Sequence, residues 1–310
     1  MLKSRILPII IVLLIILCNG NEGVAQVVDS SGFQTDTLNR KKFALVTVAG
    51  ASAYTLSIAG LYGLWYKDYP QSSFHFFNDN QEWLQMDKYA HVTASYYIGR
   101  IGYSAFRWSG VSEKKAIWYG GMTGFVFLAA IETMDGFSKD WGASTGDLVA
   151  NTMGTALFIS QQLIWHEQKF VMKYSFHSSP YAHYNPDQLG STTLQHIVKD
   201  YNGQTYWISA NISSLGLQNT RFPKWLNIAA GYGAEGMTGG PGNPGIINGI
   251  LVPYSERYRQ FYLAADIDLS RIPVKSKTLK LILNTIGFIK IPMPTLEFNK
   301  NGVKFHALYF

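Results

Sequence analysis

The stretch that decides the fold runs from Met86 to Gly154 and contains the segments MDKYAH (86–91), IETMD (131–135) and GASTGDLVANTMG (142–154). Each segment sets ionisable side chains into apolar, glycine-rich sequence. Spacings of three or four residues place the paired side chains of a segment on one face of a helix. Because a charge within an apolar helix is costly, each group needs a partner or a function. We therefore expect one inward-facing polar cluster, which comprises Asp87, Lys88, His91, Glu132, Asp135, Asp147 and Asn151.

The composition indicates a membrane-associated or envelope protein. Of the 310 residues, 47% are hydrophobic and 15% are charged, whereas about a quarter are charged in soluble globular proteins. The length suffices for two domains. The net charge of +6 is spread along the chain, so we expect no nucleic-acid partner. Membrane or envelope lipid is the partner that the composition favours, and the sequence identifies no protein partner.

Residues 1–25 have the pattern of a secretory signal peptide. Lys3 and Arg5 precede about twelve apolar residues (6–17), a run too short to span a bilayer. Small residues at positions 23 and 25 favour cleavage before Gln26. The single cysteine, Cys18, leaves lipidation as the alternative, although Leu17 stands where a lipoprotein signal has a small residue. We expect an exported protein in the periplasm or associated with the outer membrane, with the inner membrane as the alternative.

Residues 26–42 form a polar lead-in, and residues 43–172 are predicted to form a bundle of about four apolar helices. The expected helices cover residues 43–66, 83–108, 113–134 and 145–171. The first is free of formal charge and long enough to be a transmembrane or fully buried helix. Short connections favour antiparallel neighbours. Gly154 is expected to permit close helix packing.

Residues 173–310 are predicted to be rich in β-strands, so the predicted fold class is α+β. Runs with a two-residue period cover residues 204–212, 225–234, 260–269 and 303–310. Four to six strands suit an antiparallel sheet or a partial barrel, because a closed outer-membrane barrel needs at least eight. Counted back in steps of two from Phe310, the series Leu308, His306, Lys304 loses its apolar character halfway. This pattern favours an ordinary final strand over a barrel-type terminus.

The three polar segments resemble two families over residues 85–160. The motifs that carry the resemblance are Asp87-Lys88-x-x-His91, Glu132-x-x-Asp135 and Asp147-x-x-x-Asn151-x-x-Gly154. They resemble the YfiM-like family of predicted periplasmic lipoproteins of unknown function. Their order is also similar to that in VanZ-like membrane proteins, whose second motif is E-x-x-Q where this chain has Asp135. The resemblance implies an envelope location and a helical core, but no settled reaction.

Three interpretations of the polar cluster are open. In the first, it is a structural network in which Lys88 neutralises a carboxylate, His91 donates to Glu132 and Asn151 bridges helices, and the protein has a structural or interaction role. In the second, Asp87, His91 and Glu132 are candidate catalytic residues of a membrane-proximal enzyme acting on a lipid or cell-wall precursor. In the third, the imidazole and the carboxylates hold a divalent metal ion. The sequence leaves open whether the protein is an enzyme.

Overall fold

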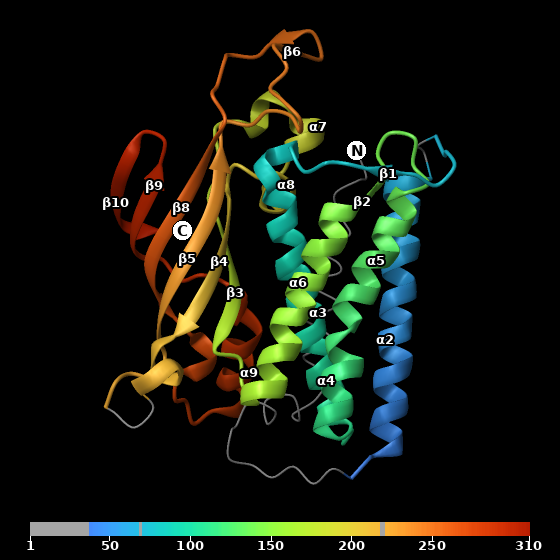
Figure 1. The fold of residues 1–310 in the computed structure, drawn as a ribbon, viewed down its shortest axis with the longest axis vertical. Helices are drawn as coiled ribbons and strands as arrows, with labels where there is room; N and C mark the ends of the chain where they lie inside the picture. Colours follow the sequence, from blue (N-terminus) through green and yellow to red (C-terminus); the bar gives the residue numbers. More distant parts are fainter. Residues whose placement is uncertain (1–36, 68–69, 218–220) are drawn as a thin grey trace. The chain divides into compact units, whose positions relative to one another are not determined.

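The computed structural model describes residues 37–67, 70–217 and 221–310 (Figure 1). The predicted signal peptide, its cleavage site and Cys18 lie outside these residues. Within them, helices occupy the N-terminal part and an antiparallel sheet the C-terminal part, which confirms the α+β class. The chain divides into two compact units. Among the described residues, a helical unit comprises 37–67, 70–78, 91–168 and 275–285, and a sheet unit comprises 79–90, 169–217, 221–274 and 286–310.

The main helices are α2 (Arg40–Leu61), α3 (Met86–Trp108), α4 (Glu113–Gly121), α5 (Thr123–Asp135) and α6 (Thr145–Trp165), with α9 (Lys277–Thr285) further along the chain. The predicted third helix is interrupted at Met122, between α4 and α5. The fourth ends at Trp165 rather than near residue 171, because His166 adopts a left-handed conformation (φ 56°) that stops it. The first turn of α3 belongs to the sheet unit, and the rest of α3 to the helical unit.

Glycines let the helices around α3 approach at backbone distance. A Cβ atom on Gly154 of α6 would lie 2.1 Å from the carbonyl oxygen of Val92, and one on Gly124 of α5 would lie 2.1 Å from that of Ser95. Such contacts are possible only without a side chain. The predicted packing role of Gly154 is confirmed. Since His91 lies one turn before Ser95, the same contacts bring it beside α5 and α6.

The sheet unit is built on β3 (Phe170–Phe176), β4 (Gln204–Asn211), β5 (Leu226–Glu235), β8 (Tyr258–Ile267), β9 (Met293–Asn299) and β10 (Gly302–Tyr309). Neighbours in the order β10-β9-β8-β5-β4-β3 all pair antiparallel. Four of these strands were predicted. The two that were missed are β3, where the sequence predicted the end of a helix, and β9. Short elements of the unit are β6 (Ile246–Ile247), β7 (Ile250–Leu251), α7 (Pro186–Leu189) and α8 (Thr193–Lys199).

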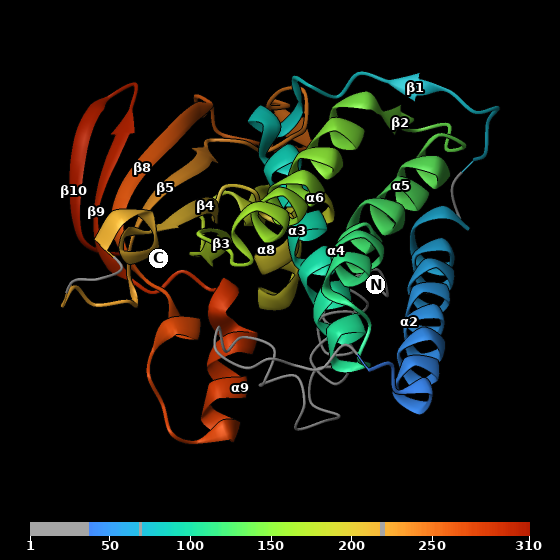
Figure 2. The same cartoon turned by 60° about the horizontal axis from the view of Figure 1, so that its bottom comes forward.

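The sheet is curved (Figure 2), and polar side chains contact one another across one of its faces. Tyr309 of β10 reaches over to β4, where its hydroxyl lies 3.1 Å from that of Thr205, and it donates to the hydroxyl of Tyr262 at 2.7 Å. Near them, Lys173 forms an ion pair with Asp266 at 2.7 Å, and Lys290 lies 3.7 Å from the other oxygen of Asp266. All three of these charged side chains are fully buried. The interior of the unit is therefore organised by hydrogen bonds and ion pairs.

The titration of Lys290 tests this polar interior. Burial lowers the pKa of its ammonium group from 10.5 to about 8, although Asp266 acts in the opposite direction. At pH values between about 8 and 10.5, the Lys290 side chain is protonated in the unfolded chain and largely deprotonated in the folded chain. The free energy of unfolding therefore rises with pH across this window. In denaturant unfolding, we expect the free energy of unfolding of the wild type to rise across this window by on the order of 2–3 kcal/mol more than that of Lys290→Met. A stability difference that stays constant across the window would contradict the assignment.

Candidate functional site

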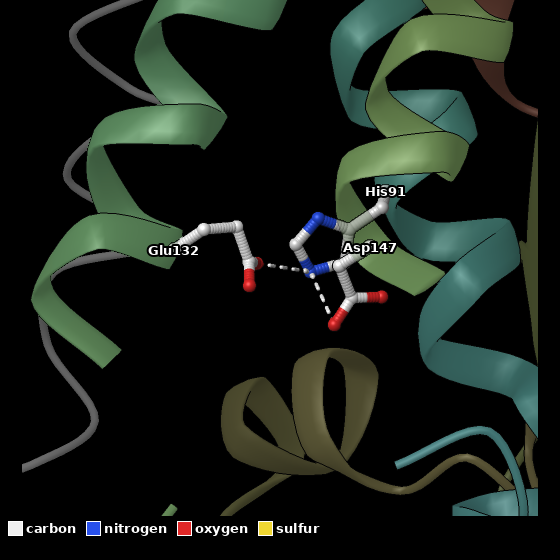
Figure 3. A group of neighbouring side chains, drawn as sticks. All are labelled: His91, Glu132 and Asp147. Carbon is white, nitrogen blue, oxygen red and sulfur yellow. Dashed lines mark ion pairs between the residues drawn. The ribbon is translucent and has the colours of Figure 1, made fainter. Parts of the chain in front are cut away.

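Three helices each contribute one ionisable side chain to a triad formed by His91, Glu132 and Asp147 (Figure 3). His91 extends from α3, Glu132 from α5 and Asp147 from the first turn of α6. The Nε2 atom of His91 lies 3.9 Å from Oε1 of Glu132 and 3.9 Å from Oδ2 of Asp147. Both carboxylates are buried, whereas 21% of the His91 side chain is exposed. The sequence analysis predicted all three residues, and the structure brings them together.

Asn151 orients the imidazole of His91. The side-chain oxygen of Asn151, a fully buried residue of α6, lies 3.0 Å from Nδ1 of His91. An amide oxygen only accepts hydrogen bonds, so Nδ1 must carry a proton and donate it. In the neutral ring this leaves the lone pair on Nε2, the nitrogen that faces the two carboxylates. Asn151 thus bridges α6 and α3, as the structural interpretation expected, and it also fixes which nitrogen faces the triad.

Ser144 contacts the Glu132 carboxylate and the backbone of Asp147. Its backbone N–H donates to Oε2 of Glu132 at 2.9 Å, and its hydroxyl accepts from the backbone N–H of Asp147 at 3.0 Å. Ser144 is therefore the N-cap of α6. The position of Asp147 in the first turn is favoured by the helix dipole. One serine thus bonds the Glu132 carboxylate of α5 and caps the helix that carries Asp147.

Asp135 has a different role from the triad. Its Oδ1 accepts hydrogen bonds from the hydroxyl of Tyr66 at 2.6 Å and from the indole N–H of Trp141 at 2.5 Å. Burial, together with the nearby Asp135 carboxylate, raises the pKa of the Tyr66 hydroxyl, which keeps it a donor. Asp135 therefore connects the end of α5 to two aromatic side chains. Tyr66 and Trp141 were missed by the sequence analysis because no periodic pattern marks them.

Asp87 and Lys88 belong to the sheet unit. The ammonium group of Lys88 lies 2.9 Å from the Asp87 carboxylate and 2.6 Å from that of Asp79, a residue that the sequence analysis did not select. Lys88 thus neutralises neighbouring carboxylates, as one interpretation expected. The side chain that orients His91 is the amide of Asn151.

The triad has the donor atoms of a metal site. A separation of 3.9 Å is too long for a hydrogen bond, so the imidazole is not bonded directly to either carboxylate. One ligand atom from each residue can be chosen so that all three lie within 4.8 Å of one another. Imidazole nitrogen and carboxylate oxygen together are ligands typical of zinc and of divalent iron or manganese. The arrangement also allows an imidazolium held between two carboxylates.

A family model described as "Predicted periplasmic lipoprotein (DUF2279)" matches residues 75–161, a segment that contains the whole triad and Asn151. This match supports an exported, periplasmic protein. Neither the curated proteins nor the solved structures provide a match to the chain.

The orientation of His91 can be tested by substituting Asn151. We expect nitrogen NMR of the imidazole, at a pH where imidazoles are neutral, to place the ring proton on Nδ1 in the wild type. In Asn151→Leu the hydrogen bond is lost, so this preference should decrease. Thr152→Ala, at an exposed position of the same helix, is the matched control and should keep it. An Asn151→Leu spectrum identical to that of the wild type would show that Asn151 does not orient the ring.

Proposed function

We propose that this is an exported envelope protein whose helical unit binds a divalent metal ion through His91, Glu132 and Asp147. One observation carries the proposal. The imidazole nitrogen that faces the two buried carboxylates is the one left with a lone pair when Asn151 holds the other. A lone pair directed at two carboxylates is repulsive, and a divalent cation among the three groups would remove this repulsion.

The spacing of the triad suits a small ion. Ligand atoms about 2.1 Å from one ion lie about 3.0 Å apart at a right angle and about 4.2 Å apart on opposite sides. The two distances of 3.9 Å from Nε2 fall inside this range. Rotations that move the carboxylate oxygens by less than about 1 Å would complete the coordination. Among the ions with this ligand preference, zinc is the one that we propose.

A hydrolytic activity is the second candidate function, and the number of ligands favours it. Three protein ligands leave a coordination position for water, as in catalytic zinc sites. The partly exposed side chain of His91 gives solvent access to the triad. In this alternative, the ion activates water against a lipid or cell-wall precursor.

We also infer that α2 to α6 form a membrane-associated bundle. The segments Arg40–Leu61 and Glu113–Asp135 are long and apolar enough to cross a membrane, and almost none of the first is buried within the protein. Exposed apolar side chains along a helix of this length are stabilised by lipid. The proposed partner is therefore envelope lipid, and the metal site would lie close to it.

Metal analysis tests the proposal. We expect the chelator-treated protein to bind one equivalent of zinc in titration calorimetry, and elemental analysis of the dialysed complex to confirm it. His91→Gln, Glu132→Gln and Asp147→Asn should each weaken binding by at least tenfold, because each removes a ligand. The matched controls are His166→Gln and Asp140→Asn, which alter an exposed imidazole and an exposed carboxylate of the same unit.

Two outcomes would contradict the proposal. If the folded wild type binds no divalent ion and His91→Gln lowers only its melting temperature, the triad is a structural network. If the control variants lose zinc as the triad variants do, the ion binds elsewhere. Circular dichroism on every variant separates loss of a ligand from loss of the fold.

A further inference from the structure

The sheet of the C-terminal unit has an inverted polarity. Along β8 and β9 the buried residues are largely polar, and the exposed residues between them are apolar. The buried polar residues of these strands are Gln260, Asp266, Thr295 and Glu297. In a water-soluble antiparallel sheet the apolar residues face the core and the polar residues face solvent. The opposite arrangement is typical of sheets that face lipid.

The exposed apolar side chains lie on one face. Cross-strand pairing aligns Phe261 with Phe298, Leu263 with Leu296, and Leu296 with Phe305. Since directly paired residues share a face, these side chains form a continuous surface over β8, β9 and β10. We call it the convex apolar face; its members are Ile208, Ile228, Phe261, Leu263, Leu296, Phe298, Val303, Phe305, Leu308 and Phe310. All of them are exposed, up to 68% for Phe305 and 72% for Leu308.

A β-bulge extends this face to the end of the chain. The pairing of β10 with β9 shifts between His306 and Tyr309. Before the bulge Val303 and Phe305 point outward, and after it Leu308 and Phe310 take that position. Tyr309 remains inward, where it meets Tyr262 and Thr205. The local irregularity thus keeps every large apolar residue of the last strand on the outer face.

The unit covers only one end of this face with its own chain. Tyr232, which pairs with Phe261, is buried against Met86 and stacks on Tyr89 with ring centroids 4.3 Å apart. Its hydroxyl donates to the carbonyl oxygen of Leu84. Residues 83–90 therefore protect the face at this end, as is usual for apolar side chains in water. The remainder of the same face has no such cover among the described residues of the unit.

We propose that the convex apolar face docks on a phospholipid membrane with anionic head groups and contacts its acyl chains. Basic side chains at the two ends of the face support an anionic membrane as the partner. Exposed Arg259 lies at the start of β8, and exposed Arg221 and Lys224 precede β5, whose start pairs with the opposite end of β8. Basic residues beside an apolar surface match acyl chains bordered by phosphate groups. In a symmetric dimer through the same face, these basic ends would meet like charges.

The docking can be followed with a single fluorophore. An environment-sensitive dye is attached to Phe298→Cys or to Phe305→Cys in the full-length Cys18→Ser chain. The matched control is Ser191→Cys, at an exposed polar position of the same unit. With vesicles of phosphatidylglycerol and phosphatidylethanolamine, we expect a blue shift and a several-fold rise in emission at positions 298 and 305 only. Lipids brominated on the acyl chains should quench these two labels, and phosphatidylcholine vesicles should act more weakly.

Three results would overturn the docking proposal. Labels that stay solvent-like with vesicles would show that the face does not enter the membrane. A blue shift that grows with protein concentration without lipid would assign the face to a second copy of the chain. Equal quenching at Ser191→Cys would show non-specific insertion. Unchanged thermal unfolding of the labelled variants is expected, because the substituted side chains are exposed, and it excludes misfolding as the source of a signal. The fluorescence expected at positions 298 and 305 does not depend on whether the helical unit binds a metal ion.

Discussion

The burial of two carboxylates beside one imidazole is the constraint on which the helical unit depends. Glu132 and Asp147 are removed from water, and a single serine and the first turn of α6 compensate part of that cost. His91 reaches them because Gly124 and Gly154 allow α5 and α6 to contact the backbone of α3. Any side chain at these glycines would separate the helices that supply the triad. The close helix packing at these two glycines therefore also brings the residues of the triad together.

Both units bury charged side chains and expose large apolar ones. In the helical unit both carboxylates of the triad are buried while α2 exposes most of its apolar surface. In the sheet unit Lys173, Asp266 and Lys290 are enclosed while the convex apolar face is exposed. This distribution accounts for a chain that is 47% hydrophobic and 15% charged, because many of its apolar residues lie at the surface. It agrees with the match to predicted periplasmic lipoproteins.

Much of the site could be predicted from the sequence, because helical spacing and the cost of buried charge selected His91, Glu132, Asp147 and Asn151. The same reasoning could not separate Asp135 from the triad, since its partners Tyr66 and Trp141 are set by tertiary packing. Strand β3 was missed because it follows closely after an apolar helix. The periodicity of a short apolar run does not distinguish a strand from the end of a helix. The last strand shows a further limit. A count in steps of two fails at His306 because the bulge changes the register there.

Anomalous X-ray diffraction at the zinc edge, on crystals grown with zinc, tests the central claim most directly. We predict one strong anomalous peak about 2.0–2.2 Å from Nε2 of His91 and from one oxygen each of Glu132 and Asp147. Asn151 should still accept from Nδ1 in that structure. An occupied zinc elsewhere, with the triad closed by a direct hydrogen bond from Nε2 to a carboxylate, would contradict the account and make the triad a structural ion pair.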